Sequence, residues 1–201
     1  MLTGAEIKRL VKLGEIRISD FSEERLNPNS YNLRLGDKLL IYDIPYIIEG
    51  NSHKDRRFEK IIYSANACID SKKDNPVKEI YIPSSGLVLM PGVFYLGTTV
   101  ETTYAGEYIP CISGRSSMAR LGLEIHRTAG FGDIGFNGKW TLEMTCPVPL
   151  KIYPNQEICQ IYFEKPDGET TIKYKGRYQN QDDVIASRMF MTKEEVGKNN
   201  E

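Results

Sequence analysis

The sequence lacks the features that mark several large classes of protein. It has no run of about 18 apolar residues, so neither a membrane span nor a membrane partner is expected. Neither sign of charge is in surplus, because 26 Lys and Arg stand against 27 Asp and Glu, which gives a formal net charge of −1. Non-specific binding to nucleic acid needs clustered surplus cations, so that partner is not expected either. A small anionic ligand remains compatible with this composition, since its pocket needs only a few local cations.

Cysteine and histidine are too few and too scattered for common metal and redox motifs. The 4 cysteines include no Cys-x-x-Cys pair, which predicts reduced thiols packed as small hydrophobic residues. One catalytic zinc motif combines His-x-Glu with Pro-Cys-x-x-Cys, whereas Glu124 and His126 stand in the reverse order here, so no zinc is expected. The N-terminus lacks the apolar segment and cleavage site of a secretory leader, so we expect a cytoplasmic protein.

Length and patterning indicate one mainly β domain in a chain of 201 residues. Thr3 and Glu6 have the spacing of a helix capping box, and Gly14 is a stop signal after apolar residues at helical spacing. From Ile80 onward, short apolar segments alternate with Pro and Gly turns, which is typical of an all-β sandwich or barrel. The predicted strands are 31–35, 38–42, 81–82, 87–90, 94–100, 108–112, 139–145, 150–153 and 157–163.

Two segments depart from this pattern. Residues 43–80 mix β-like pieces with charge clusters, and we interpret them as a variable hairpin or loop excursion on the surface. Residues 1–169 then form the domain, while residues 170–201 form a C-terminal arm or lid with a tail. The last stretch, residues 193–201, is charged and is predicted to be frayed.

A glycine, an arginine and two serines at residues 114–117 precede a short helical run predicted at 118–121. Backbone N–H groups at a helix start favour an anion, and Arg115 adds a planar fork suited to phosphate oxygens. Ser116 and Ser117 add neutral donors. No Gly-x-x-x-x-Gly-Lys-Ser/Thr motif is present, which excludes a P-loop. Taken alone, the tetrapeptide also fits an ordinary helix cap beside a surface arginine.

The predicted strand 139–145 carries a lone carboxylate among core-like residues. Its alternation places Thr141, Glu143 and Thr145 on one face and apolar residues on the other. Partial burial would raise the pKa of Glu143 and suit it to proton transfer near neutrality, although a cation such as Arg120 would oppose that rise. The alternative is a solvent-facing glutamate on a one-sided sheet.

Four glycines fall within the ten residues 129–138. Such a loop allows the backbone to approach a ligand closely. Asp133 is suited to accept a hydrogen bond from a sugar hydroxyl, and Phe131 or Phe136 to lie against a sugar or base. A tight loop with a structural aspartate is the alternative explanation.

Taken together, these motifs resemble the dCTP deaminase branch of the trimeric dUTPase-like family. The matching strings are 114–123, 128–138 and 141–143, supported by 26–38, 89–98, 176–181 and 187–188. The resemblance implies a distorted β-barrel or jelly-roll-like protomer with a short N-terminal helix and a C-terminal arm. It further implies a homotrimer with active sites between subunits, and Mg²⁺ bound through the nucleotide triphosphate instead of a protein-bound zinc.

The resemblance also implies catalytic roles for individual residues. Glu143 matches the family's general base and acid. Ser116, Arg120 and the backbone carbonyl of Ala129 match groups that hold the attacking water and the base. The sequence departs from the family at Gly132 and Ile134, where an aliphatic residue and a proline are usual.

Substrate contacts are carried over in the same way. Triphosphate contacts are matched by Arg115, Ser116 and Ser117, the deoxyribose contact by Asp133, an aromatic ring on the sugar by Phe136, and the pyrimidine edge by Thr141 and Leu142. In the arm, the looser matches to phosphate and sugar contacts are Tyr174, Arg177 and Gln181. Arg177 stands where a lysine is common, which keeps the charge but changes the geometry.

The function implied by this resemblance is hydrolytic deamination of dCTP to dUTP and ammonia. One alternative is a bifunctional enzyme that also cleaves the triphosphate and releases dUMP and pyrophosphate. A plain dUTPase is less favoured, because residues 116–123 and the N-terminal helix resemble the deaminase branch. A non-catalytic nucleotide-binding module on the same fold is a further alternative, since a fold alone does not establish function.

Overall fold

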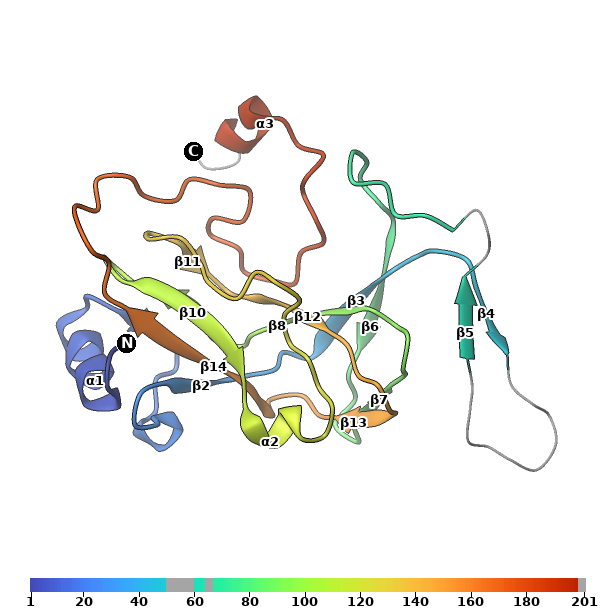
Figure 1. Cartoon of the computed structure of the whole chain (residues 1–201), viewed down its shortest axis with the longest axis horizontal. Coiled ribbons are helices and arrows are strands. Elements are labelled where there is room, and N and C mark those ends of the chain that lie inside the picture. Colours follow the sequence, from blue (N-terminus) through green and yellow to red (C-terminus); the bar gives the residue numbers. More distant parts are fainter. Residues whose placement is uncertain (50–59, 64–66, 199–201) are drawn as a thin grey trace.

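The computed structural model describes residues 1–49, 60–63 and 67–198 (Figure 1). The chain begins with helix α1 (Gly4–Leu13), whose ends lie at the predicted residues. Thr3 Oγ1 accepts a hydrogen bond from the Glu6 N–H at 3.3 Å, and Gly14 ends the helix with a φ of 76°. The Glu6 carboxylate does not complete the capping box, because it pairs with Arg9. No helix among the described residues is long and apolar enough to cross a membrane.

Short antiparallel strands form most of the fold. One sheet has the order β10 (Ile109–Gly114), β14 (Glu157–Glu164), β2 (Tyr31–Arg34), and another has β12 (Thr141–Met144), β8 (Tyr95–Thr98), β3 (Lys38–Tyr42), β6 (Val77–Tyr81). Smaller sheets join β1 (Arg17–Ile18), β9 (Thr103–Tyr104) and β11 (Asn137–Gly138), then β13 (Leu150–Ile152) and β7 (Leu87–Leu89), and β4 (Tyr46–Glu49) and β5 (Lys60–Tyr63). The predicted mainly β class is confirmed, but the sheets of the described residues do not close into one barrel.

Buried and half-buried residues alternate along strand β12. Leu142 and Met144 are buried in the core beside residues such as Leu33 and Phe163, whereas Thr141 and Glu143 are half-buried on the opposite face. A strand of period 2 presents alternate residues to opposite faces, so the core holds two side chains and leaves the other two directed away from it. The predicted division of faces is confirmed for the four residues of β12, whereas Trp140, which the same alternation placed on the core face, precedes the strand and is half-buried.

Part of the 43–80 segment belongs to a main sheet, although the whole segment was predicted to be a surface excursion. Strands β4 and β5 pair with each other, at the right of Figure 1, which fits a hairpin excursion. Strand β6, however, pairs with β3 along its full length, from Lys38 opposite Tyr81 to Tyr42 opposite Val77. Residues 77–80 therefore belong to the four-stranded sheet, and residues 50–59 and 64–66 lie outside the described residues.

Two short helices differ from the sequence prediction. Helix α2 (Ser116–Ala119) starts two residues before the predicted run, with Arg115 at the cap position. The predicted frayed tail instead contains helix α3 (Lys193–Lys198). Its start is a capping box, in which the Thr192 N–H donates to Glu195 Oε2 at 2.7 Å and the Glu195 N–H donates to Thr192 Oγ1 at 3.4 Å. The sequence contains the Thr-x-x-Glu signature of this capping box.

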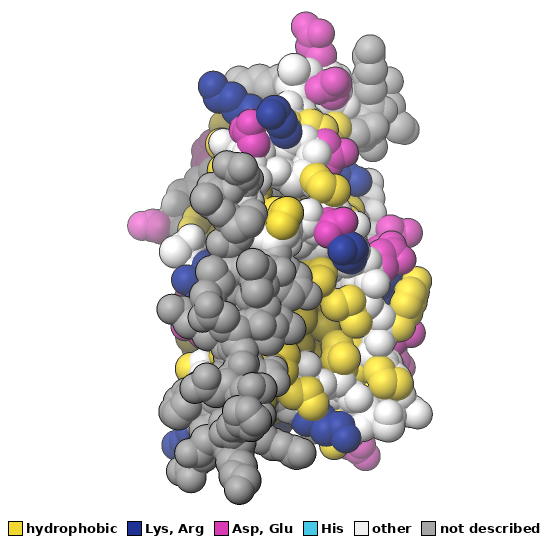
Figure 2. Space-filling model, turned by 90° about the vertical axis from the view of Figure 1, so that its right-hand side faces the viewer, with side chains coloured by type: hydrophobic (Ala, Val, Ile, Leu, Met, Phe, Trp, Pro, Cys, Tyr) yellow, Lys and Arg dark blue, Asp and Glu magenta, His cyan; other side chains and the backbone are white. Residues whose placement is uncertain are grey.

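Hydrophobic side chains gather on one face of the molecule. Figure 2 shows this face, which is the right-hand end of Figure 1 where β6, β7 and β13 lie. Exposed apolar residues of these elements and the turns beside them include Tyr81, Val88 and Tyr153, at 62%, 45% and 42% exposure. A gathering of exposed apolar side chains of this kind is typical of a surface that contacts another protein.

Candidate functional site

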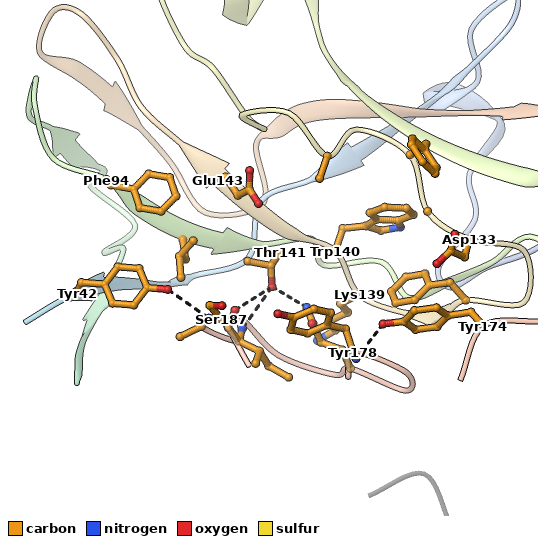
Figure 3. Close-up of a pocket in the computed structure, with 18 residues that line it drawn as sticks. Tyr42, Phe94, Asp133, Lys139, Trp140, Thr141, Glu143, Tyr174, Tyr178 and Ser187 are labelled. Atoms are coloured by element: carbon orange, nitrogen blue, oxygen red, sulfur yellow. Dashed lines mark hydrogen bonds between the residues drawn. The ribbon is translucent and has the colours of Figure 1, made fainter. Parts of the chain in front are cut away.

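A cavity of about 440 Å³ lies between β12, the glycine-rich loop and the C-terminal arm (Figure 3). That volume is in the range of sites for small ligands. Its lining includes these predicted site residues: Ala129, Asp133, Phe136, Thr141, Glu143, Tyr174 and Gln181. Leu142, the remaining residue predicted to read the pyrimidine edge, has its side chain 1% exposed in the core, so it could reach a ligand here only through its backbone.

Glu143 enters the cavity with one carboxylate oxygen already held. Its Oε2 accepts a hydrogen bond from the Arg127 N–H at 2.9 Å. The Glu143 N–H in turn donates to the Ile125 carbonyl at 2.9 Å, which ties β12 to the 125–127 segment. No hydrogen bond to Oε1 is found within the described part of the chain. The carboxylate is thus oriented through one of its two oxygens.

Aromatic rings fix the end of the cavity where Asp133 lies (Figure 3). The Phe136 ring is 5.0 Å from that of Trp140 and 5.9 Å from that of Tyr174, in tilted and edge-on arrangements. Trp140 is held by its Nε1–H, which donates to Thr103 Oγ1 at 2.8 Å. Burial raises the pKa of the Tyr174 hydroxyl, so it is neutral at physiological pH. Phe136 can therefore offer a ring in a fixed place to a ligand in the cavity.

The C-terminal arm covers the cavity through contacts with β12. Thr141 Oγ1 accepts hydrogen bonds from Gln181 Nε2 at 2.7 Å and from the Ile185 N–H at 3.3 Å, and its hydroxyl lies 3.5 Å from the Ile185 carbonyl. Val184 is buried between these arm residues, against Leu96 of the neighbouring strand. Thr141, predicted to read a pyrimidine edge, is thus engaged by the arm of its own chain.

Two further contacts hold the arm near β3. The Ser187 N–H donates to the Tyr42 hydroxyl at 3.2 Å. Asp183 forms an ion pair with Lys38 and also accepts a hydrogen bond from the Val184 N–H at 2.7 Å. Burial pushes the pKa of Asp183 up, but the bonds from Lys38 and the Val184 N–H outweigh this effect and leave that pKa below its usual value.

The glycine-rich loop accommodates the protein's own arm and core. A Cβ on Gly138 would lie 2.9 Å from the Gln181 carbonyl oxygen, and one on Gly135 would lie 2.9 Å from Lys173 Cβ. A Cβ on Gly132 would lie 2.6 Å from the Trp140 ring, which explains why this position lacks an aliphatic side chain. Close approach to a ligand was expected to explain these glycines, whereas packing within the chain accounts for them.

The predicted phosphate-binding residues lie elsewhere. Arg115, Ser116, Ser117 and Arg120 are at or beside helix α2, at the opposite end of the molecule from the arm in Figure 1, and none of them lines the cavity. Both serines and Arg120 are exposed. Within one chain, the predicted site therefore divides into a nucleoside-sized cavity and a separate group of predicted phosphate-binding residues.

Arg177 also lies away from the cavity lining. Its Nη2 donates to the Met191 carbonyl at 2.9 Å, and its carbonyl accepts from Arg188 Nη1 at 2.9 Å. Its Nε is buried without a hydrogen-bond partner in the described chain. In this arrangement of the arm, Arg177 supports the turn toward α3.

Several residues that line the cavity were not predicted. They include Tyr42, Phe94, Lys139, Trp140 and Tyr178. Trp140 was assigned to the core face of its strand, and Tyr178 lies inside the arm string that carried the resemblance. Tyr42 and Phe94 face each other with ring centroids 6.4 Å apart at the opposite end of the cavity from Asp133 (Figure 3), and no local pattern in the sequence marks them. No cluster of three or more metal-ligating side chains is found in the described residues.

Comparison with known proteins identifies close relatives. A family model described as dCTP deaminase-like matches residues 1–166. The chain is 48% identical to "dCTP deaminase, dUMP-forming" of Hathewaya histolytica over 94% of this chain and 97% of that protein. It is 42% identical to the protein of the same name from Cytophaga hutchinsonii over 94% of this chain and 96% of that protein.

A solved structure supports the fold. The crystal structure of 2′-deoxycytidine 5′-triphosphate deaminase from Agrobacterium tumefaciens matches with a TM-score of 0.55 at 20% identity, over 81% of this chain and 47% of that one. At that identity the likeness shows the fold, and the predicted dUTPase-like class is confirmed.

The names of these relatives correct the expected product. The sequence was interpreted first as a deaminase that releases dUTP, whereas the relatives are named dUMP-forming. The motifs at residues 114–143 were interpreted as serving nucleotide binding and proton transfer, which both reactions need. They do not report whether a phosphoanhydride bond is also cleaved, so the motifs alone could not decide the product.

Proposed function

The chain belongs to the dCTP deaminase-like family, and we propose that it converts dCTP, with two waters, into dUMP, ammonia and pyrophosphate. The observation that carries this proposal is the Glu143 carboxylate, which lines a nucleoside-sized cavity with Oε2 held by the Arg127 N–H. A module that only binds nucleotides does not need a proton-exchanging carboxylate at this place.

In the deamination step, a water attacks C4 of the cytosine while Glu143 takes one of its protons. N3 of the ring is protonated as the tetrahedral intermediate forms. The exocyclic nitrogen then leaves as ammonia after a second proton transfer, and C4 keeps the oxygen of the water. Positioned acid–base catalysis of this kind contributes roughly 10²–10⁴-fold in rate. The Ala129 carbonyl, which lines the same cavity, is suited to accept a hydrogen bond from the attacking water.

The sugar is assigned to the end of the cavity that holds Asp133 and Phe136. Asp133 would accept a hydrogen bond from the deoxyribose hydroxyl. The Phe136 ring, fixed by Trp140 and Tyr174, would lie against the sugar and leave no room for a 2′-hydroxyl. This arrangement favours deoxyribonucleotides over ribonucleotides.

The triphosphate is assigned to Arg115, Ser116 and Ser117. A guanidinium fork and two hydroxyls suit phosphate oxygens. Mg²⁺ would arrive as part of the substrate, bound to the phosphate oxygens, and would neutralise charge during cleavage between the α- and β-phosphates. In that cleavage a second water adds to the α-phosphate and pyrophosphate leaves.

A homotrimer would join the two halves of the site. Because helix α2 lies away from the cavity in one chain, its Arg115 and Arg120 would complete the cavity of a neighbouring subunit. Closed symmetry repeats such a contact identically around the ring. The exposed hydrophobic face in Figure 2 supports contacts between subunits. A cytoplasmic location suits an enzyme of nucleotide metabolism and stays a prediction.

Incubation with dCTP and Mg²⁺ tests this function directly. Ammonia, dUTP, dUMP and pyrophosphate are measured in the same time course. We expect equal amounts of ammonia, dUMP and pyrophosphate, with no accumulation of dUTP. Ammonia with stoichiometric dUTP would contradict the phosphate cleavage, and intact dCTP without ammonia would contradict catalysis altogether.

A further inference from the structure

A buried polar network joins the turn before β2 to the predicted triphosphate ligands. Ser30 and Asn32 are only 5% and 6% exposed, although both side chains are polar. Burying polar groups is unfavourable unless they are hydrogen-bonded, so their partners indicate why they are there. These partners lie on β14, the central strand of the β10–β14–β2 sheet, and through β14 they lead to residues 114 and 115.

One branch of the network leads to the Arg115 side chain. Asn32 Nδ2 donates to Glu157 Oε2 at 2.9 Å. The same oxygen lies 2.9 Å from Arg115 Nη1, which also donates to the Glu157 carbonyl at 3.0 Å. Arg115 Nε and Nη2 have no hydrogen-bond partner among the residues that the structure describes. The guanidinium is thus held from one nitrogen, while the donors on its other nitrogens remain for the oxygens of a ligand.

The second branch leads to the main chain just before Arg115. Ser30 Oγ donates to Gln160 Oε1 at 2.7 Å, and Gln160 Nε2 donates to the Gly114 carbonyl at 3.0 Å. Asn27 joins the branches, because its Nδ2 donates to Asn32 Oδ1 at 2.8 Å and to Ser30 Oγ at 3.2 Å. The peptide that precedes Arg115 and the end of its side chain are therefore anchored from one turn.

From this geometry we propose that Asn32 and Ser30 are positioning residues for the triphosphate, acting through Glu157 and Gln160 on Arg115. The inference rests on the proposed function, in which Arg115 binds phosphate. An arginine already fixed in its binding orientation loses little side-chain entropy when the ligand arrives. Asn32 also keeps the Glu157 carboxylate beside Nη1, so that this negative charge does not turn toward the phosphate oxygens.

The substitution Asn32→Asp tests the first branch. It keeps the size of the side chain, removes the donor to Glu157 and places a second carboxylate beside it. We expect KM for dCTP to rise roughly tenfold, the worth of one charge-assisted hydrogen bond. The inhibition constant of deoxycytidine, which has no phosphate, should change less than about twofold. Asn29→Asp is the matched control, because Asn29 is exposed on the same turn and has no contact with Glu157.

A double-mutant cycle separates this role from general damage to the fold. In an Arg115→Ala background, Asn32→Asp should raise KM for dCTP by less than about twofold, because its effect passes through Arg115. An equal loss of affinity for dCTP and deoxycytidine, or a full additional effect without Arg115, would overturn the inference. If Arg115→Ala raises KM and Asn32→Asp does not, the positioning role alone fails. If Arg115→Ala leaves KM unchanged, the phosphate role in the proposed function fails with it.

Discussion

Thr141 Oγ1 lies 2.7 Å from Gln181 Nε2, so a strand residue two positions before Glu143 holds the C-terminal arm by its hydroxyl. The same oxygen accepts a bond from the Ile185 N–H. Gln181 is only 6% exposed, and its amide would be left unpaired in the interior without this partner. The position of the arm and the face of β12 that carries Glu143 are therefore coupled through one side chain.

Replacement of this hydroxyl should loosen the arm. Thr141→Val keeps the shape of the side chain but removes the acceptor for Gln181 and Ile185, which we expect to cost about 1–3 kcal/mol in arm closure. Trp140, the single tryptophan of the chain, lines the covered cavity and reports the change. Quenching of its fluorescence by acrylamide should increase in Thr141→Val and stay near wild type in Thr141→Ser. Equal quenching in both variants would contradict the coupling.

Glu143→Gln should abolish turnover without unfolding the protein. The amide oxygen of glutamine still accepts the bond from the Arg127 N–H, so the side chain keeps its place, but it no longer exchanges a proton. We expect the rate of ammonia release to fall by at least about 10²-fold, with KM within a few-fold and Tm within a few degrees. Near-normal turnover in this variant would remove Glu143 from the mechanism.

Mixing two inactive variants should restore activity if sites form between subunits. Glu143→Gln disables the cavity, and Arg120→Ala disables the surface of α2 that would complete the neighbouring cavity. After subunit exchange at equal amounts, about one quarter of the sites would draw both intact residues from different chains and recover. Matched mixtures of each variant with itself are the control. No recovery, with exchange verified by mass spectrometry, would indicate a site completed within one chain.

The Lys38–Asp183 ion pair gives arm closure a pH dependence. Since its pKa in the folded protein is lowered, Asp183 contributes to closure fully above its unfolded pKa of about 3.9. That contribution is lost as pH falls through the lower folded value. Trp140 quenching should therefore increase as pH falls below about 4, and Asp183→Asn should show weaker closure at pH 7 with a flatter profile between pH 5 and 3. An identical profile in the variant would assign the acid transition to other groups.

Substitution of Gly138 tests whether glycine is needed in this loop to leave space for the C-terminal arm. A Cβ at this position would lie 2.9 Å from the Gln181 carbonyl oxygen, and the backbone has a φ of 154°. Gly138→Ala should displace residues near 181 and raise their amide hydrogen exchange. Gly168→Ala is the control, because Gly168 also has a positive φ, of 95°, but no atom lies within 4 Å of its added Cβ. If amide hydrogen exchange near residue 181 were equal in the two variants, contact with the arm would not explain the glycine at position 138.

Local rules determined much of this protein from the sequence alone. The cap at Thr3 and the stop at Gly14 bound the first helix, because both depend on residues within one turn of the helix end. The alternation of β12 placed Glu143 away from the core, since period 2 is a property of the strand itself. The motif strings identified the family, because these residues stand close together in the chain.

Tertiary structure decided how those pieces are used. The arm as the partner of Thr141, the contact of Gly138 with Gln181 and the separation of α2 from the cavity all depend on residues distant in sequence. The same holds for the network that runs from Asn32 on β2 through Glu157 on β14 to Arg115, the residue after β10. A side chain's identity fixes which bonds it can make, but only the packing of strands and arm fixes which partners come within about 3 Å of it.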